Sequence, residues 1–159
     1  MRRRLCPALL LLFVISLIAP PAAAQENWRT FSVPEFGTRV EFPAGLFSES
    51  EGAPQRGSGQ RFRTADGQAQ LSIYALRREG LTPAGYLRAN LQVPRQSLYY
   101  QRIAPNFFAI SARHGDMIYY SRCNFGSEAI HCVYVIYPGD QKRAFDSVVT
   151  RISRTLRPL

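Results

Sequence analysis

The sequence has few of the residues on which enzymes usually depend. It contains two histidines, three cysteines and one lysine in 159 residues. No Gly-x-Ser-x-Gly or Ser-x-x-Lys motif is present, which excludes two common serine nucleophiles. The segment Gly57-Ser58-Gly59 lacks both the third glycine of a dinucleotide loop and the lysine of a P-loop. The sequence therefore predicts no catalytic residue and no cofactor-binding residue.

The few cysteines also limit the kinds of site available. Cys6 lies in an N-terminal leader, which leaves Cys123 and Cys132 for the folded chain. A redox pair is usually separated by two residues, and a zinc site needs further ligands at suitable spacing. An even number of cysteines in an exported chain favours a structural disulfide between Cys123 and Cys132, with a reactive or metal-binding pair as the alternative. We predict no metal site.

Residues 1–24 have the three parts of a secretory signal peptide. Three arginines (residues 2–4) precede an apolar run over residues 9–19, and Ala22 and Ala24 stand at the spacing that signal peptidase recognises. The apolar run is shorter than the about 20 residues that span a bilayer. We predict cleavage after Ala24, a secreted or periplasmic protein and no transmembrane segment in the mature chain; an uncleaved signal anchor is the alternative.

The remaining residues, 25–159, suit a single domain with a real core. Loss of the three leader arginines lowers the net charge from +9 to +6, and Lys142 is the only lysine. Such a charge allows weak, salt-sensitive contact with anionic surfaces, although ordinary solubility explains it as well. Because export separates the chain from the nucleic acids of the cytoplasm, we expect no nucleic acid as a partner.

Alternating apolar residues and turn signals predict a strand-rich fold with two helices. Thr82 and Pro83 are a typical helix start, and a second helix, with Asp140 as its cap, has a continuous apolar face. We predict that the segment Ala44–Gly59 is a mobile loop. The predicted strands and helices cover these ranges: strands 30–33, 38–42, 60–64, 69–77, 96–104, 107–113, 117–125 and 129–137; helices from residue 82 to before Pro94 and from 140 to 156.

We predict that the two strands that contain the cysteines lie at the centre of the fold. If Cys123 faces Cys132, then Ser127 and Glu128 form the turn, and the segment 133–137 is apolar on both faces. A strand that is apolar on both faces is covered on both sides. We therefore predict an α+β fold, an antiparallel β-sheet with helices packed on its faces.

The two histidines and the polar residues near them are the candidates for a catalytic or contact role. His114 is followed by Gly115 and Asp116, so it is either a general base oriented by Asp116 or part of a polar turn. His131 is either exposed or hydrogen-bonded within the sheet. We predict that Arg122, Asn124 and His131 lie at an uncovered polar end of the sheet, and that this end forms a contact surface together with the loop Ala44–Gly59.

The segment Phe31–Phe47, with its pattern Phe-Ser-Val-Pro-x-Phe-Gly-x-x-Val-x-Phe-Pro-x-x-Leu-Phe, resembles the opening hairpin of the PsbP-like fold. That group includes a photosystem extrinsic subunit, a yeast Ran-binding import factor and small exported bacterial proteins. The order of the later elements is similar. The resemblance implies an α/β/α sandwich used as a binding or accessory module, without a shared active site. A Cys123–Cys132 disulfide is not typical of the group.

These observations predict an exported, non-enzymatic binding or accessory protein of the periplasm or cell envelope, whose partner the sequence does not name. Two alternatives remain open. One is a small-ligand-binding or hydrolytic domain of the cone-like α+β type, with a pocket lined by tyrosine and histidine. The other is an envelope component that binds anionic lipid or polymer through its arginines.

Overall fold

A computed structural model describes residues 27–91 and 93–158. The predicted signal peptide, residues 1–24, lies outside the described residues. The chain forms ten strands, two α-helices and three short 3₁₀ helices, within these ranges. The elements are β1 (Trp28–Val33), η1 (Pro34–Phe36), β2 (Thr38–Pro43), β3 (Glu49–Gly52), β4 (Ser58–Arg63), β5 (Gln70–Arg77), α1 (Pro83–Asn90), η2 (Arg95–Ser97), β6 (Leu98–Ala104), β7 (Phe107–His114), β8 (Met117–Phe125), β9 (Ala129–Pro138), η3 (Gly139–Gln141), α2 (Lys142–Thr155) and β10 (Arg157–Pro158).

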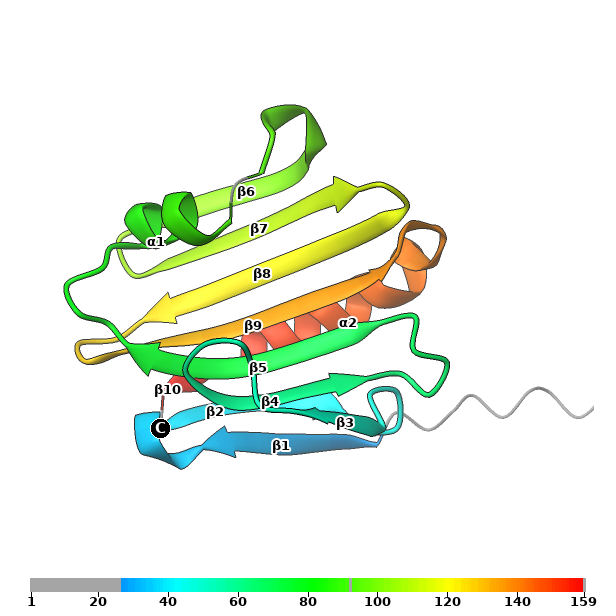
Figure 1. Cartoon of the computed structure of the whole chain (residues 1–159), viewed down its shortest axis with the longest axis horizontal. Helices are drawn as coiled ribbons and strands as arrows, with labels where there is room; N and C mark the ends of the chain where they lie inside the picture. Colours follow the sequence, from blue (N-terminus) through cyan, green and yellow to red (C-terminus); the bar gives the residue numbers. More distant parts are fainter. Residues whose placement is uncertain (1–26, 92, 159) are drawn as a thin grey trace, which may run out of the picture.

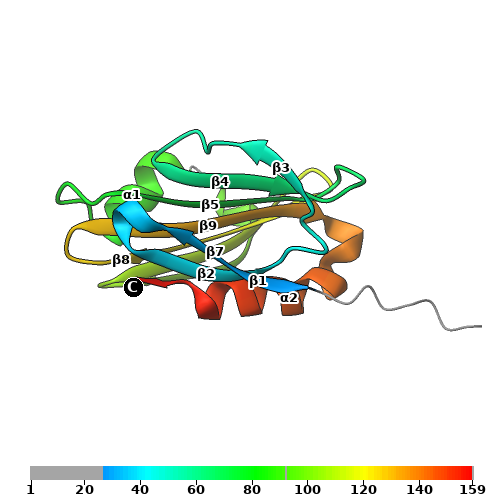
Figure 2. The same cartoon turned by 90° about the horizontal axis from the view of Figure 1, so that it is seen from below.

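The strands form two antiparallel sheets. The large sheet has seven strands in the order β3-β4-β5-β9-β8-β7-β6, and the small sheet has the order β1-β2-β10 (Figure 1). The helices α1 and α2 lie on opposite sides of the large sheet (Figure 2). We call these sides the α1 face and the α2 face. The prediction of an α+β fold with helices on both faces of an antiparallel sheet is confirmed.

The hairpin of β8 and β9 has the predicted register. Cys123 lies opposite Cys132, and the two form a disulfide. Val133 and Val135 are completely buried on the α2 face. On the other face of the same strand, Tyr134 and Ile136 are only partly buried. The expectation that this segment is covered on both sides is therefore correct for one face only.

The α2 face carries the larger core cluster. The predicted apolar side of α2 is buried against it through Phe145, Val148, Val149, Ile152 and Leu156. Burying an aliphatic or aromatic side chain of this size stabilises the fold by about 1.5–3 kcal/mol. The small sheet lies beside α2 on this face, since its strand β2 contacts the helix.

The start of α2 differs from the prediction. Asp140 does not cap the helix, because the chain forms η3 at Gly139–Gln141 before α2 begins. Gln141 is the N-cap residue, and its side chain makes no capping hydrogen bond.

Helix α1 begins as predicted. The N–H of Gly85 donates a hydrogen bond of 3.1 Å to Thr82 Oγ1, and Pro83 occupies the first turn. Tyr86 and Leu87 are buried in a second core cluster that includes the disulfide. With only eight residues, α1 covers one end of its face, and no other α-helix of residues 27–91 and 93–158 lies on the rest of that face.

The prediction that Ala44–Gly59 is simply a loop is wrong, because the segment contains β3. This strand has no apolar alternation, and Ser50 and Glu49 are placed by their pairing with Phe62 and Arg63 of β4. The chain then returns across the α1 face into β4. At Gly59, whose φ is +152°, a Cβ atom would lie 2.0 Å from the carbonyl oxygen of Ile73, so only glycine allows this close approach to β5.

Candidate functional site

A groove lies on the α1 face where α1 does not reach. It has a volume of about 410 Å³ and is bounded by α1 on one side and by the segment between β3 and β4 on the other. We call it the tyrosine groove. It is lined by Gln55, Arg56, Arg61, Gln70, Ser72, Tyr74, Tyr86, Asn90, Leu91, Tyr134 and Ile136.

The floor of the groove follows from the alternation of β5. Leu71, Ile73 and Ala75 point to the α2 face and are completely buried, whereas Ser72 and Tyr74 point the other way and line the groove. Because successive side chains of a strand face opposite sides, one strand supplies both the core and the polar floor.

Three tyrosines supply ring surfaces and hydroxyl groups. The hydroxyl oxygens of Tyr74 and Tyr86 lie 3.3 Å apart, within hydrogen-bonding distance. Burial raises the pKa of Tyr74 well above its ordinary value and also raises the pKa of Tyr134. The hydroxyls of Tyr74 and Tyr134 therefore stay protonated at neutral pH and can donate hydrogen bonds.

Two arginines make the groove positive. Arg61 donates from Nε to the carbonyl oxygen of Ala53 at 3.0 Å and from Nη2 to that of Glu51 at 3.0 Å, so its guanidinium is held in place by neutral acceptors. Arg56 is exposed at the rim. None of the lining residues carries a carboxylate.

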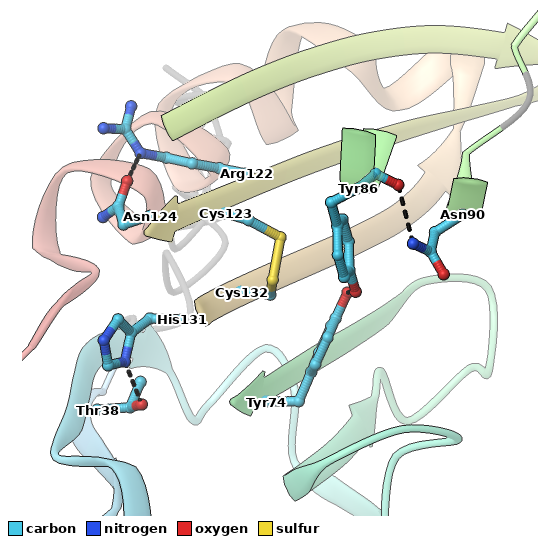
Figure 3. Close-up of a disulfide and its surroundings, with 9 residues drawn as sticks. All are labelled: Thr38, Tyr74, Tyr86, Asn90, Arg122, Cys123, Asn124, His131 and Cys132. Atoms are coloured by element: carbon cyan, nitrogen blue, oxygen red, sulfur yellow. Dashed lines mark hydrogen bonds between the residues drawn. A yellow bond between two sulfur atoms is a disulfide. The ribbon is translucent and has the colours of Figure 1, made fainter. Parts of the chain in front are cut away.

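A side-chain hydrogen bond within α1 stabilises the helix, which forms one wall of the tyrosine groove. Asn90 Nδ2 donates to the carbonyl oxygen of Tyr86 at 2.8 Å. Figure 3 shows Tyr74, Tyr86 and Asn90 together beside the Cys123–Cys132 disulfide. The disulfide belongs to the same buried cluster as Tyr86 and Leu87, and so it supports the helix that forms one side of the groove.

The three residues of the predicted contact surface come together elsewhere, on the α2 face. Arg122, Asn124 and His131 line a smaller cleft of about 260 Å³ near the end of the chain. Arg122 Nε donates to Asn124 Oδ1 at 3.0 Å, and Asn124 Nδ2 donates to the carbonyl oxygen of Leu156 at 2.8 Å. The loop Ala44–Gly59 contributes to the tyrosine groove on the other face, so the structure does not unite the two halves of the predicted surface.

The expectation of an uncovered polar end is wrong for His131. Its side chain is buried, with 2% of the residue exposed, and its Nδ1 lies 2.7 Å from Thr38 Oγ1 of β2 (Figure 3). Strand β2 covers this end of β9, which the sequence did not reveal because the pairing spans 93 positions. Burial lowers the pKa of His131.

The other residues considered for catalysis do not assemble a site. His114 is exposed at the end of β7, and Asp116 pairs with Arg113 Nη2 at 3.4 Å. Within residues 27–91 and 93–158, no group of three or more histidine, cysteine, aspartate or glutamate residues is placed to hold a metal ion. No helix in this described part of the chain is long and apolar enough to cross a membrane.

Sequence reasoning missed the tyrosine groove. The available signal was the segment Gln70–Tyr74, in which Gln70, Ser72 and Tyr74 alternate with Leu71 and Ile73. This pattern places polar side chains on one face of a strand. That the face remains open depends on the short α1 and on the path of the chain before β4, which are tertiary features.

Comparisons with known proteins identify the fold. No protein-family model matches the chain, and no curated protein matches it either. Among solved structures, the solution structure of cyanobacterial PsbP (CyanoP) from Synechocystis sp. PCC 6803 is similar, with a TM-score of 0.62 and 10% sequence identity. The match covers 90% of this chain and 99% of the other. At this identity the likeness concerns the fold alone: the chain has the PsbP-like fold.

Proposed function

We propose that the chain is an exported, non-enzymatic binding or accessory protein of the periplasm or cell envelope, and that the tyrosine groove is its binding site. The groove is the single observation that carries this proposal. It combines two guanidinium groups, three phenol rings and no carboxylate in an open concave surface.

The proposal of export relies on the leader and the cysteines. Residues 1–24 have the pattern of a signal peptide, and the two cysteines that remain form a disulfide, a bond that persists in oxidising compartments. Mass measurement of the exported protein tests it. We expect loss of residues 1–24 and a mass lower than that of the reduced chain by two hydrogen atoms. Two alkylatable thiols in the native protein would contradict the assignment.

The chemistry of the groove favours an anionic ligand with a flat or apolar part. Arg56 and Arg61 attract an oxyanion, and guanidinium groups bind carboxylate and phosphate well. The hydroxyls of Tyr74 and Tyr134 add neutral donors, while the tyrosine rings together with Leu91 and Ile136 offer apolar contact. A carboxylate or phosphate attached to a ring or a short hydrocarbon fits these groups.

The alternatives from the sequence have less support. The groove has tyrosines but no histidine, unlike the pocket expected of the hydrolytic alternative. On α2, Lys142 pairs with Asp146 at 2.7 Å and Arg151 pairs with Glu41 at 2.9 Å, so part of the basic surface is already neutralised. Weak contact with anionic surfaces stays a prediction.

Titration of the mature protein with phenyl phosphate tests the proposal. A ligand of this size that gains about 0.4 kcal/mol per non-hydrogen atom binds with a Kd of about 1 mM. Benzyl alcohol, which has the ring without the charge, is expected to bind at least about tenfold more weakly. Equal binding of the two compounds would contradict the electrostatic part of the proposal, and no binding of either would contradict the ligand class.

Two groove variants and one control locate the site. Arg56→Gln removes an exposed charge, and Tyr134→Phe removes only a hydroxyl; each is expected to weaken phenyl phosphate binding about three- to tenfold. Arg77→Gln is the matched control, because Arg77 is exposed on β5 but its side chain lies on the α2 face. Unchanged binding in both groove variants, or equal loss in the control, would place the site elsewhere.

A further inference from the structure

Strand β6 forms an edge of the large sheet that is exposed on both of its faces. It pairs with β7 on one side only. Five successive residues, Tyr99 to Ile103, are exposed. The exposed large apolar side chains of the described residues all lie here: Tyr99 at 53%, Tyr100 at 47% and Ile103 at 45%. Proteins usually protect such edges, because their free N–H and C=O groups can pair with another strand.

A groove with a mixed polar and apolar lining runs beside this edge on the α1 face. It has a volume of about 480 Å³ and separates β6 from α1 and from the segment that follows α1. Arg88, Arg95 and Gln101 are its polar residues, and its apolar residues are Ala84, Leu87, Leu91, Val93, Leu98, Ile103 and Ile110. A strand added to β6 would place every second side chain next to Ile103 and into this groove. In recognition by strand addition, such pockets for alternate side chains provide the specificity.

The charge around the edge has one sign. Between Glu79 and Asp116 the sequence contains four arginines and no acidic residue. Arg88 and Arg95 line the groove. Arg102 points to the α2 face, where its guanidinium carbon lies 5.4 Å from the ring centre of Phe107. Within the part of the chain that the structure describes, these three arginines form no ion pair.

A second copy of this chain does not fit the edge. Pairing β6 with β6 of another copy would bring arginines of like charge together. The opposite edge, β3, is acidic, but Glu49 already pairs with Arg63 at 2.6 Å and Glu51 lies 3.8 Å from the same arginine. The four residues of β3 include no large apolar side chain for the groove.

We propose that β6 binds an extended, acidic segment of a partner protein, which adds to the large sheet as a further strand. Side chains of this segment alternate. Those next to Gln101 and Ile103 are apolar and enter the groove, and those next to Tyr100 and Arg102 are acidic and pair with the guanidinium of Arg102. This interaction does not rest on the tyrosine groove, which lies between α1 and the segment before β4, although Leu91 lines both grooves.

Three nine-residue peptides with blocked ends test the proposal on the mature protein. All have valine at alternate positions; the positions between carry aspartate with threonine, threonine alone, or lysine with threonine. The acidic peptide is expected to bind at least about tenfold more tightly than the lysine peptide, and less tightly as salt increases. Equal binding of all three, or no binding of the acidic peptide, would overturn the proposal.

Variants of exposed residues separate the two parts of the recognition. Arg102→Glu is expected to weaken the acidic peptide about tenfold and to strengthen the lysine peptide. Ile103→Asp is expected to weaken all three peptides, because each places valine beside position 103. Arg39→Glu, an exposed charge on β2 in the small sheet, is the matched control and should leave both affinities unchanged. A control effect as large as that of Arg102→Glu would mean that only net charge is sensed.

Hydrogen exchange tests strand addition itself. With the acidic peptide bound, those amides of residues 98–104 that do not already donate to β7 are expected to become protected, while the amides of β3 are unchanged. Binding without this protection would mean docking through side chains alone and would refute strand addition. Sedimentation of the protein without peptide is expected to show a monomer; a dimer broken by Arg102→Glu or Ile103→Asp would show that a second copy is the occupant and overturn the acidic-partner proposal.

Discussion

Replacing both cysteines by alanine should destabilise the protein by a measurable and predictable amount. Cys123 and Cys132 are completely buried in the cluster under α1. The neighbouring cross-strand pairs, Asn124 with His131 and Phe125 with Ile130, keep the hairpin paired with or without the bond. The loss of the disulfide therefore acts mainly on the unfolded chain.

The magnitude follows from the size of the closed loop. The cysteines are nine positions apart, and closing a loop of this length contributes about 2.5 kcal/mol in the chain-entropy model. Truncating two buried side chains to alanine adds a smaller cost from lost packing. We expect the double variant to lose about 3 kcal/mol of its free energy of unfolding.

Urea unfolding of the mature protein, with and without a reductant, measures this loss. With an m-value of about 2 kcal/mol per molar urea, reduction should lower the midpoint of the wild type by about 1 M. The double variant should unfold at a similarly low midpoint, and its midpoint should not change when the reductant is added. Equal midpoints for oxidised and reduced wild type would refute the reasoning, because the bond would then be absent or without effect on the unfolded chain.

Two further predictions concern the wall of the tyrosine groove and the buried histidine. Thr82→Ala removes the cap of α1 and should lower the free energy of unfolding by about 1 kcal/mol. The control Thr150→Ala, at an exposed position of α2, should change it by less than about 0.5 kcal/mol. Urea midpoints measure both effects, and equal losses would contradict the role of Thr82 as a cap. Burial lowers the pKa of His131, so the unfolded chain binds a proton first as pH falls below about 6.5, and stability is lost from there down through the folded pKa. His131→Gln should flatten the dependence of the free energy of unfolding on pH in this range. An unchanged slope would contradict the lowered pKa of His131.

The local features of the fold were accessible from the sequence. Thr82 and Pro83 marked the start of α1, and the apolar spacing of α2 identified its buried side. The two cysteines fixed the register of β8 and β9, because only one pairing places them opposite each other. In each case the signal lies within a few residues along the chain, where propensity and spacing act directly.

The exposure of the central hairpin was predicted correctly only in part. The polar residues near its turn suggested an open end, yet His131 is covered by β2 through its contact with Thr38. The apolar segment 133–137 suggested cover on both faces, yet Tyr134 and Ile136 line the groove. Both outcomes depend on distant elements, namely the position of the small sheet and the length of α1.

The strands that the sequence did not predict, β3 and β10, also depend on distant parts of the chain. The sequence of β3 has no strand pattern, and the strand is placed by its pairing with Arg61, Phe62 and Arg63 of β4. Similarly, β10 consists of two residues that pair with Arg39 and Thr38 of β2. Tertiary pairing, rather than local preference, gives such segments their structure.

Chemical-shift mapping with phenyl phosphate tests the central claim, binding in the tyrosine groove, most directly. Backbone amide signals of the mature protein are assigned and followed during the titration. The account predicts the largest saturable shifts at Ser72, Tyr74 and Tyr134, with smaller changes at Asn90 and Leu91. Shifts centred on the cleft of Arg122 and Asn124, or spread over the exposed arginines without saturation, would contradict it.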